Sequence, residues 1–126
     1  MVVVQWAEKA SGILLIDTQG QWRWDELGQA LDGVAVMLTQ ITAPIVGALA
    51  LRHIQLAPGF CTAATKLAAL KLGGLVMWGE TLDSWFAIQV IREVAALPYS
   101  LYPVREVIDL IPCAVTILNA VLPIQG

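Results

Sequence analysis

The sequence predicts an α/β fold with one mainly parallel five-stranded sheet, which begins with a β-hairpin and is accompanied by about four helices. Short apolar runs alternate with segments of helical periodicity along the chain, and this order is typical of parallel sheets crossed by helices. Several of the apolar runs also lack a polar face, as expected for strands covered on both sides. No internal repeat or linker divides the 126 residues, so a single core is expected.

The first three elements are predicted to be two strands and a helix. Residues 2–6 and 13–17 are short apolar runs separated by a charged, glycine-ended turn, which indicates a hairpin. Asp25 and Glu26 then open a helix, since the positive end of the helix dipole favours carboxylates in the first turn. The helix carries an apolar stripe at steps of four, three, four and three residues: Leu27, Leu31, Val34, Leu38 and Ile41.

Strands and helices alternate along the rest of the chain. Further strands are predicted where apolar runs lie between breakers, at residues 45–51, 73–79 and 99–102. Further helices are predicted at residues 60–70, from a cap at Thr81 or Asp83 to Pro98, and from Pro103 to Pro112. Residues 1–111 would form the domain, and residues 112–126 an apolar helical extension that packs on it or at an oligomer interface.

One stretch raises the question of a membrane span. Residues 33–51 carry no charge, and nineteen residues are close to the about 20 that a spanning helix needs. Polar residues and a proline interrupt this stretch, however: Thr39, Gln40, Thr42 and Pro44. We therefore expect a helix, a break and a buried strand here. The N-terminus lacks the basic region of a secretory signal, and two cysteines without a disulfide framework fit a reducing cytoplasm.

The composition indicates more apolar surface than one small core needs. Charged residues make up 13% of the chain, against about 25% in an average domain, and hydrophobic residues make up 58%. The surplus is concentrated in residues 74–78, 85–94 and 114–124. We expect it to form a homodimer or protein-partner interface. Two alternatives are a pocket for a hydrophobic ligand, with His53 or Arg52 as its polar groups, and, less favoured, membrane attachment through the tail.

Charge and metal-ligand patterns exclude several classes of function. The net charge is −3 and the seven Lys and Arg are scattered, so nucleic-acid binding is not expected. Cys61 and Cys113 form no CxxC motif and have only His53 as a further ligand, so no metal or other cofactor is expected.

No self-sufficient catalytic signature is present, and we expect no enzyme. Asp25 and Glu26 are adjacent and do not face each other on a helix, so they form no acid–base pair. A nucleophile made of Cys61 and His53 is conceivable in space, but a structural or solvated histidine is the favoured interpretation. The glycines of GGLVMWGE do not have the spacing of a phosphate-binding loop.

Three motifs in order carry a family resemblance: WRWDEL after the second strand, LAPG before the second helix, and GGLVMWGE. With the element order, they resemble the STAS fold, specifically the SpoIIAA-like (STAS/SEC14-like) family of small bacterial domains, over residues 2–111. The resemblance implies a non-enzymatic regulatory or protein-interaction domain in bacterial signalling or scaffolding. The SEC14-like relation implies a hydrophobic or lipid ligand as the alternative.

The sequence departs from the phospho-regulated STAS domains at one loop. In those relatives a serine in an Asp-Ser-Ser-Gly-like loop at the start of the second helix is phosphorylated, whereas this chain reads APGFCTAAT. Thr62 is the nearest hydroxyl, at a helix start where amide groups favour a phosphate. The alternative interpretation, Thr62 as a helix-start residue, is favoured on capping chemistry, and the anti-sigma-antagonist function is not carried over unqualified.

Trp22 and Trp24 pose a choice between a binding platform and an architectural role. A stacking platform for a ligand would need a further aromatic partner and a basic surround, which the sequence does not supply. We expect Trp24 to pack the apolar stripe of the first helix onto the sheet, with Arg23 in solvent.

Overall fold

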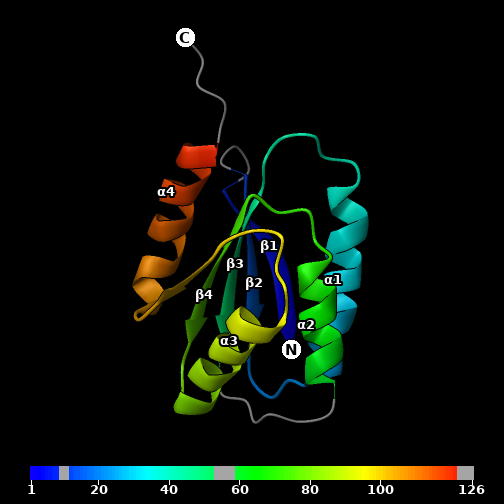
Figure 1. The fold of residues 1–126 in the computed structure, drawn as a ribbon, viewed down its shortest axis with the longest axis vertical. Helices are drawn as coiled ribbons and strands as arrows, with labels where there is room; N and C mark the ends of the chain where they lie inside the picture. Colours follow the sequence, from blue (N-terminus) through cyan, green and yellow to red (C-terminus); the bar gives the residue numbers. More distant parts are fainter. Residues whose placement is uncertain (9–11, 53–58, 122–126) are drawn as a thin grey trace.

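Five strands form one mixed sheet in which neighbours in sequence are neighbours in space. The computed structural model describes residues 1–8, 12–52 and 59–121 (Figure 1). The strands are β1 (Val2–Glu8), β2 (Ile13–Thr18), β3 (Val46–Leu51), β4 (Gly74–Gly79) and β5 (Leu101–Val104). The first pair is antiparallel and the other three pairs are parallel. The predicted α/β class and mainly parallel sheet are confirmed.

Three helices cover one face of the sheet and a fourth covers the other (Figure 1). The first three are α1 (Trp24–Leu38), α2 (Phe60–Ala68) and α3 (Leu82–Val94). Each joins two adjacent parallel strands in the same direction, and because such crossovers are right-handed the three fall on one face. A 3₁₀ turn (Val107–Asp109) leads into α4 (Leu110–Val121) on the opposite face. None of the described helices is long and apolar enough to cross a membrane.

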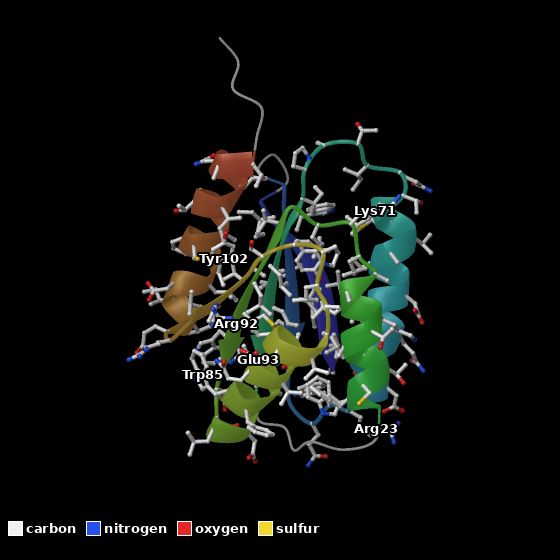
Figure 2. The ribbon with its side chains drawn as sticks, viewed as in Figure 1. Arg23, Lys71, Trp85, Arg92, Glu93 and Tyr102 are labelled. Carbon is white, nitrogen blue, oxygen red and sulfur yellow. The ribbon has the colours of Figure 1, made fainter. Side chains whose placement is uncertain are left out.

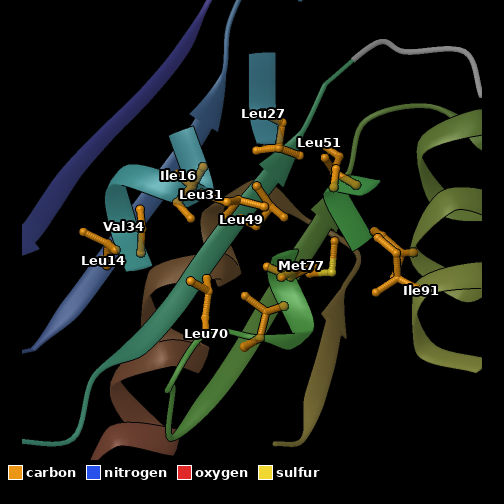
Figure 3. Close-up of a cluster of buried hydrophobic side chains, with 14 of the residues drawn as sticks. Leu14, Ile16, Leu27, Leu31, Val34, Leu49, Leu51, Leu70, Met77 and Ile91 are labelled. Atoms are coloured by element: carbon orange, nitrogen blue, oxygen red, sulfur yellow. The ribbon is translucent and has the colours of Figure 1, made fainter. Parts of the chain in front are cut away.

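The sheet separates two apolar cores because side chains alternate between its faces. Alternate strand residues pack under the three helices, as Figure 3 shows for Leu14, Ile16, Leu49, Leu51 and Met77. The other strand residues meet α4, among them Ile13, Val46, Ala48, Val76 and Trp78. Every residue of β3 and β4 is buried. The prediction of strands covered on both sides is therefore confirmed, and the two cores absorb much of the apolar surplus.

Two prolines lie where the sequence analysis did not place them. The predicted helix from Pro103 to Pro112 is wrong, because Pro103 belongs to β5 and Pro112 lies in the first turn of α4. The first turn of a helix tolerates proline, since its N–H groups have no partner within the helix. The prediction of Thr81 as a cap is correct: the Ser84 backbone N–H donates to its Oγ1 at 3.2 Å.

The orientation of β5 explains how it accommodates proline. The backbone N–H of Leu75 donates to the carbonyl of Ser100 at 3.0 Å, so Ser100 faces β4. The direction of the backbone N–H and C=O groups alternates along a strand. Those of Tyr102 and Val104 therefore also point toward β4, whereas the backbone groups of Leu101 and Pro103 point away from the sheet. The missing N–H of Pro103 is therefore on the free edge, where it removes no bond of the ladder.

Candidate functional site

A polar cluster occupies the edge of the sheet where the parallel strands end. Arg52 follows β3, and its Nε donates to Oδ1 of Asp17, near the end of β2, at 2.9 Å. Its Nη1 lies 3.7 Å from Oε2 of Glu80, which follows β4. The guanidinium also lies over the Trp78 ring, 5.4 Å from the ring centroid. Parallel pairing brings these residues together from three strands.

The charge of Arg52 is balanced within this cluster. The hydrogen bond from Arg52 to Asp17 is the largest influence on its pKa, which is raised despite partial burial. One cation facing two carboxylates leaves no positive surplus to attract an anion. Arg52 is also absent from the residues that line the apolar groove described below. Within the described residues, the contacts of Arg52 join the ends of β2, β3 and β4.

Two buried hydroxyls hold the backbone of Arg52. Oγ1 of Thr18 accepts the Arg52 N–H at 2.9 Å and donates to the Ala50 carbonyl at 2.8 Å. Oγ of Ser84 donates to the Arg52 carbonyl at 3.0 Å. Sequence reasoning missed Thr18 and Ser84. Their positions could have indicated this role, because Thr18 ends a strand and Ser84 lies near a helix start, where backbone groups need hydrogen-bond partners.

The start of α2 agrees with the interpretation of Thr62 as a helix-start residue. Thr62 is an exposed residue of the first turn, and the N-cap itself is Gly59, at φ 97°. A glycine is required there because an added Cβ would lie 3.2 Å from the Asp25 nitrogen and 3.3 Å from the Trp24 Cβ. Phosphorylation of Thr62 stays a prediction.

The two thiols lie on opposite sides of the sheet. Cys61 is exposed on α2, and Cys113 is half-buried on α4, where burial, and secondarily the nearby Asp109, raise the pKa of its thiol. His53 lies outside the described residues, so its proposed pairing with Cys61 has no geometry to judge. In the part of the chain that the structure describes, no three His, Cys, Asp or Glu side chains gather as a metal site would require.

Trp22 and Trp24 are buried and contact each other edge to face at 5.0 Å between ring centroids. Trp24 is the first residue of α1 and contacts the Phe60 ring of α2 in the same way at 4.8 Å. Arg23, the residue between them, projects into solvent (Figure 2). Neither ring presents an exposed face. The buried Nε1 of Trp22 makes no hydrogen bond within the described residues.

An apolar surface lies along α3. Leu82, Phe86, Val90 and Val94, here called the α3 stripe, recur at steps of four residues. The side chains of Leu82, Phe86 and Val94 are 87%, 57% and 74% exposed. The buried residues Ala87, Ile88 and Ile91 lie on the side of the helix that faces the sheet. Figure 2 shows Trp85 and Arg92 on the flank of α3 that faces away from α2. Helix α3 is thus apolar on its outer side as well as its inner side.

A groove separates the α3 stripe from α2, and we call it the α2–α3 groove. Its volume is about 400 Å³. Small residues line it on the α2 side, at helical spacing: Cys61, Ala64, Thr65 and Ala68. Val90, Ile91 and Val94 line it on the α3 side. The short side chains of α2 leave the space between the two helices unfilled.

Comparison with protein-family models, with curated proteins and with solved structures finds no match to this chain. A functional site is therefore inferred from the geometry of the chain's own residues. The polar cluster at Arg52 is occupied by its own ion pairs. The α3 stripe and the α2–α3 groove are exposed apolar surface, which no other described residue covers. They are the strongest candidate for a functional site.

Proposed function

We propose that this chain is a non-enzymatic regulatory domain of the STAS-like, SpoIIAA-like type, which acts in cytoplasmic bacterial signalling or scaffolding. It binds a protein partner through the α3 stripe and the α2–α3 groove, and it also self-associates. The family assignment is supported by the order of the sequence motifs together with the α/β architecture. The non-enzymatic role is supported by the ion pairing of Arg52 and the separation of Cys61 from Cys113.

The α3 stripe is the observation that carries the proposal. From Leu82 to Val94 it extends about 18 Å, or three turns of helix. Exposed apolar side chains on one continuous line are typical of a docking surface, and a large aromatic such as Phe86 is the kind of residue that anchors an interface. A groove beside such a line accepts the apolar face of an amphipathic helix. The expected partner element is therefore a helix with apolar residues at three- and four-residue steps.

A hydrophobic small molecule or lipid is the second candidate occupant. The volume of about 400 Å³ falls in the range of small-molecule sites, and the lining is mainly apolar. Membrane attachment through the α3 stripe is a weaker candidate. The exposed charges on α3 are Asp83, Arg92 and Glu93, so the helix lacks the basic surround of interfacial membrane helices.

Site-specific photocrosslinking in the cells that make this protein tests the partner. A benzophenone amino acid replaces Phe86 in the full chain, and a matched control replaces Val36, which is 65% exposed on α1. We expect a crosslink from position 86 to one defined protein, and its yield should fall at least tenfold when Leu82 and Val94 are both changed to Asp. Equal labelling from positions 86 and 36, or labelling unaffected by those changes, would contradict the proposal.

Native mass spectrometry separates the protein partner from the small ligand. A hydrophobic adduct of defined mass on the wild-type chain, lost when the groove residue Val94 is changed to Asp, would support the ligand and count against the protein partner. A wild-type spectrum free of such an adduct, with the position 86 crosslink present, supports the protein partner.

A further inference from the structure

The outer edge of β1 presents backbone groups with no partner in the sheet. Met1 and Gln19 exchange backbone hydrogen bonds, so Met1 faces β2. The direction of the backbone N–H and C=O groups alternates along a strand, so those of Val3 and Gln5 point toward β2 as well. The backbone N–H and C=O groups of the residues between them therefore point away from the sheet: Val2, Val4 and Trp6.

One of these outward groups is already bonded. The N–H of Val2 donates to Oε2 of Glu26 on α1 at 2.9 Å, which agrees with its outward direction. Within the described residues, the outward groups of Val4 and Trp6 have no hydrogen-bond partner. The unsatisfied part of the edge is thus centred on Gln5.

This edge lacks the features that normally prevent pairing between strands. Exposed edges are usually protected by charged side chains, proline or very short strands. Residues 2–7 contain no charge and no proline, and β1 is seven residues long. A register shift interrupts β1 only after Trp6. The stretch from Val3 to Trp6 is therefore a regular strand with a free, uncharged edge, and the register shift lies at Ala7.

We infer that two copies of this chain pair through β1 in antiparallel orientation, with a twofold axis at Gln5. Val4 of one copy then lies opposite Trp6 of the other, and the two residues exchange both hydrogen bonds. The symmetric Trp6–Val4 pair does the same, so four backbone hydrogen bonds form. Gln5 meets Gln5 of the second copy as a non-hydrogen-bonded pair, with Cα atoms about 4.5 Å apart. The Val2 N–H, which is bonded to Glu26, lies opposite Glu8 of the second copy and takes no part in these four hydrogen bonds.

The side chains of β1 are self-complementary in this register. Val4 and Trp6 both lie on the face covered by the three helices, so each forms an aromatic–β-branched pair with the other copy. On the α4 face, Val3 lies opposite Ala7. The two Gln5 amides meet at the axis, where each carries a donor and an acceptor. No charged residue lies between Val3 and Ala7, so the centre of the paired edge brings no like charges together. Glu8 of each copy lies opposite Val2 of the other, at the two ends of the paired stretch.

Helix α1 leaves space for the second copy. Glu26 contacts β1, so it marks the flank of α1 beside the edge. One and two turns further along the same flank are Ala30 and Gly33. A Cβ added at Gly33 would meet no atom within 4 Å. Small residues of α1 therefore border the free edge of β1 on the face that the three helices cover.

This inference rests on the self-association in the proposed function, and a charge swap at Gln5 tests it separately from the partner site. Gln5 is exposed, so Gln5→Lys and Gln5→Glu should leave the fold unchanged. Like charges directly opposite each other destabilise a strand pair. In sedimentation equilibrium we expect each variant to dimerise at least tenfold more weakly than the wild type, and an equimolar mixture to recover the dimer. The same changes at Gln89, exposed on α3, should leave dimerisation unchanged.

Three results would overturn the inference: a monomeric wild type at high micromolar concentration, unaltered dimerisation of the Gln5 variants, or no recovery in the mixture. If the position 86 crosslink persists in Gln5→Lys, the partner site stands whatever the oligomeric state.

A disulfide provides a second test of the register. Gln5→Cys is made in a chain that also carries Cys61→Ser and Cys113→Ala. A Cα separation of about 4.5 Å lies within the range that a disulfide bridges, so mild oxidation should give a covalent dimer in high yield. Gln89→Cys in the same background is the control. Equal yields from both positions would contradict pairing at Gln5.

Discussion

Helix α2 has two neighbours in its layer, and it meets them in opposite ways. Against α1 the gap is closed: Trp24 contacts Phe60, and the Lys66 Nζ reaches the Asp32 carboxylate at 2.8 Å. The stem of that lysine passes close to Gly28, where an added Cβ would be in ordinary contact with its Cδ at 3.6 Å. Against α3 the gap is open, and the α2–α3 groove of about 400 Å³ occupies it.

The difference between the two gaps comes from side-chain size, because one sheet supports all three helices. Phe60 and the long stem of Lys66 extend from α2 toward α1. Apart from Phe60, which also borders the groove, the residues that α2 presents toward α3 are alanine, cysteine and threonine. Helix α3 then keeps valines at the gap with no helix to cover them. A closed gap contributes to stability, whereas an open one leaves apolar surface for another molecule.

Removing the ring at the closed gap should have the largest effect. Trp24→Ala deletes a buried indole, and such changes cost about 3–5 kcal/mol of unfolding free energy. Trp85→Ala, on the half-buried flank of α3, is the matched control and should cost clearly less. Urea denaturation monitored by circular dichroism measures both. Equal losses would show that the ring at the closed gap contributes no more than a half-buried ring that faces away from α2.

Larger side chains on the two sides of α2 should have the next largest effect on stability. They distinguish the filled core beneath the helix from the open groove beside it. Ala63 is 2% exposed, so Ala63→Leu overpacks the core and should cost about 1–3 kcal/mol. Ala68 lines the groove, so Ala68→Leu enters free space and should change stability by no more than about 0.5 kcal/mol. Ala68→Leu should also reduce the photocrosslink from position 86. If both leucines destabilise equally, the groove is not open to side chains.

A smaller loss than those from Trp24→Ala and Ala63→Leu is expected at Tyr99, which joins the segment after α3 to α2. Its hydroxyl donates to the Leu67 carbonyl, and Tyr99→Phe should cost about 1 kcal/mol at neutral pH. Burial raises the pKa of Tyr99, so the folded protein keeps the phenol protonated where the unfolded chain ionises, from about pH 10.

The sign of the pH effect follows from this raised pKa. The contribution of Tyr99 is fully present below about pH 10 and is lost as the pH rises, by at most about 1.4 kcal/mol per pH unit. Urea midpoints of wild type and Tyr99→Phe between about pH 8 and pH 11 should therefore converge at the alkaline end. A constant difference across this range would contradict the burial of the phenol.

The order of strands and helices could be predicted because each element carries its own periodicity. Apolar runs between breakers marked the strands, and Thr81 marked the start of α3. Pro103 and Pro112 were misplaced since proline suits both an edge strand and the first turn of a helix, and local sequence does not distinguish a helix end from a helix start.

The candidate site was harder to predict because its parts come from separate elements. Arg52 was a candidate, but Asp17 and Glu80 join it only through the register of three strands. The α3 stripe is visible in LDSWFAIQVIREV, yet that helix is apolar on two sides, and its sequence does not say which side meets the sheet. The α2–α3 groove depends on how far apart two helices lie, which no local pattern encodes.

The outward nitrogen of Pro103 sets a limit on how large an assembly of these chains can grow. Of the two sheet edges, β5 is four residues long and lacks a donor at Pro103, so it is a poor template for a further strand. Pairing through β1 uses the other edge of both copies at once. An isologous contact of this kind closes on itself, whereas head-to-tail addition at two open edges would propagate into a fibre. If the chains pair through β1 as inferred above, Pro103 makes the sheet a terminating unit, and assembly through its edges would stop at two chains.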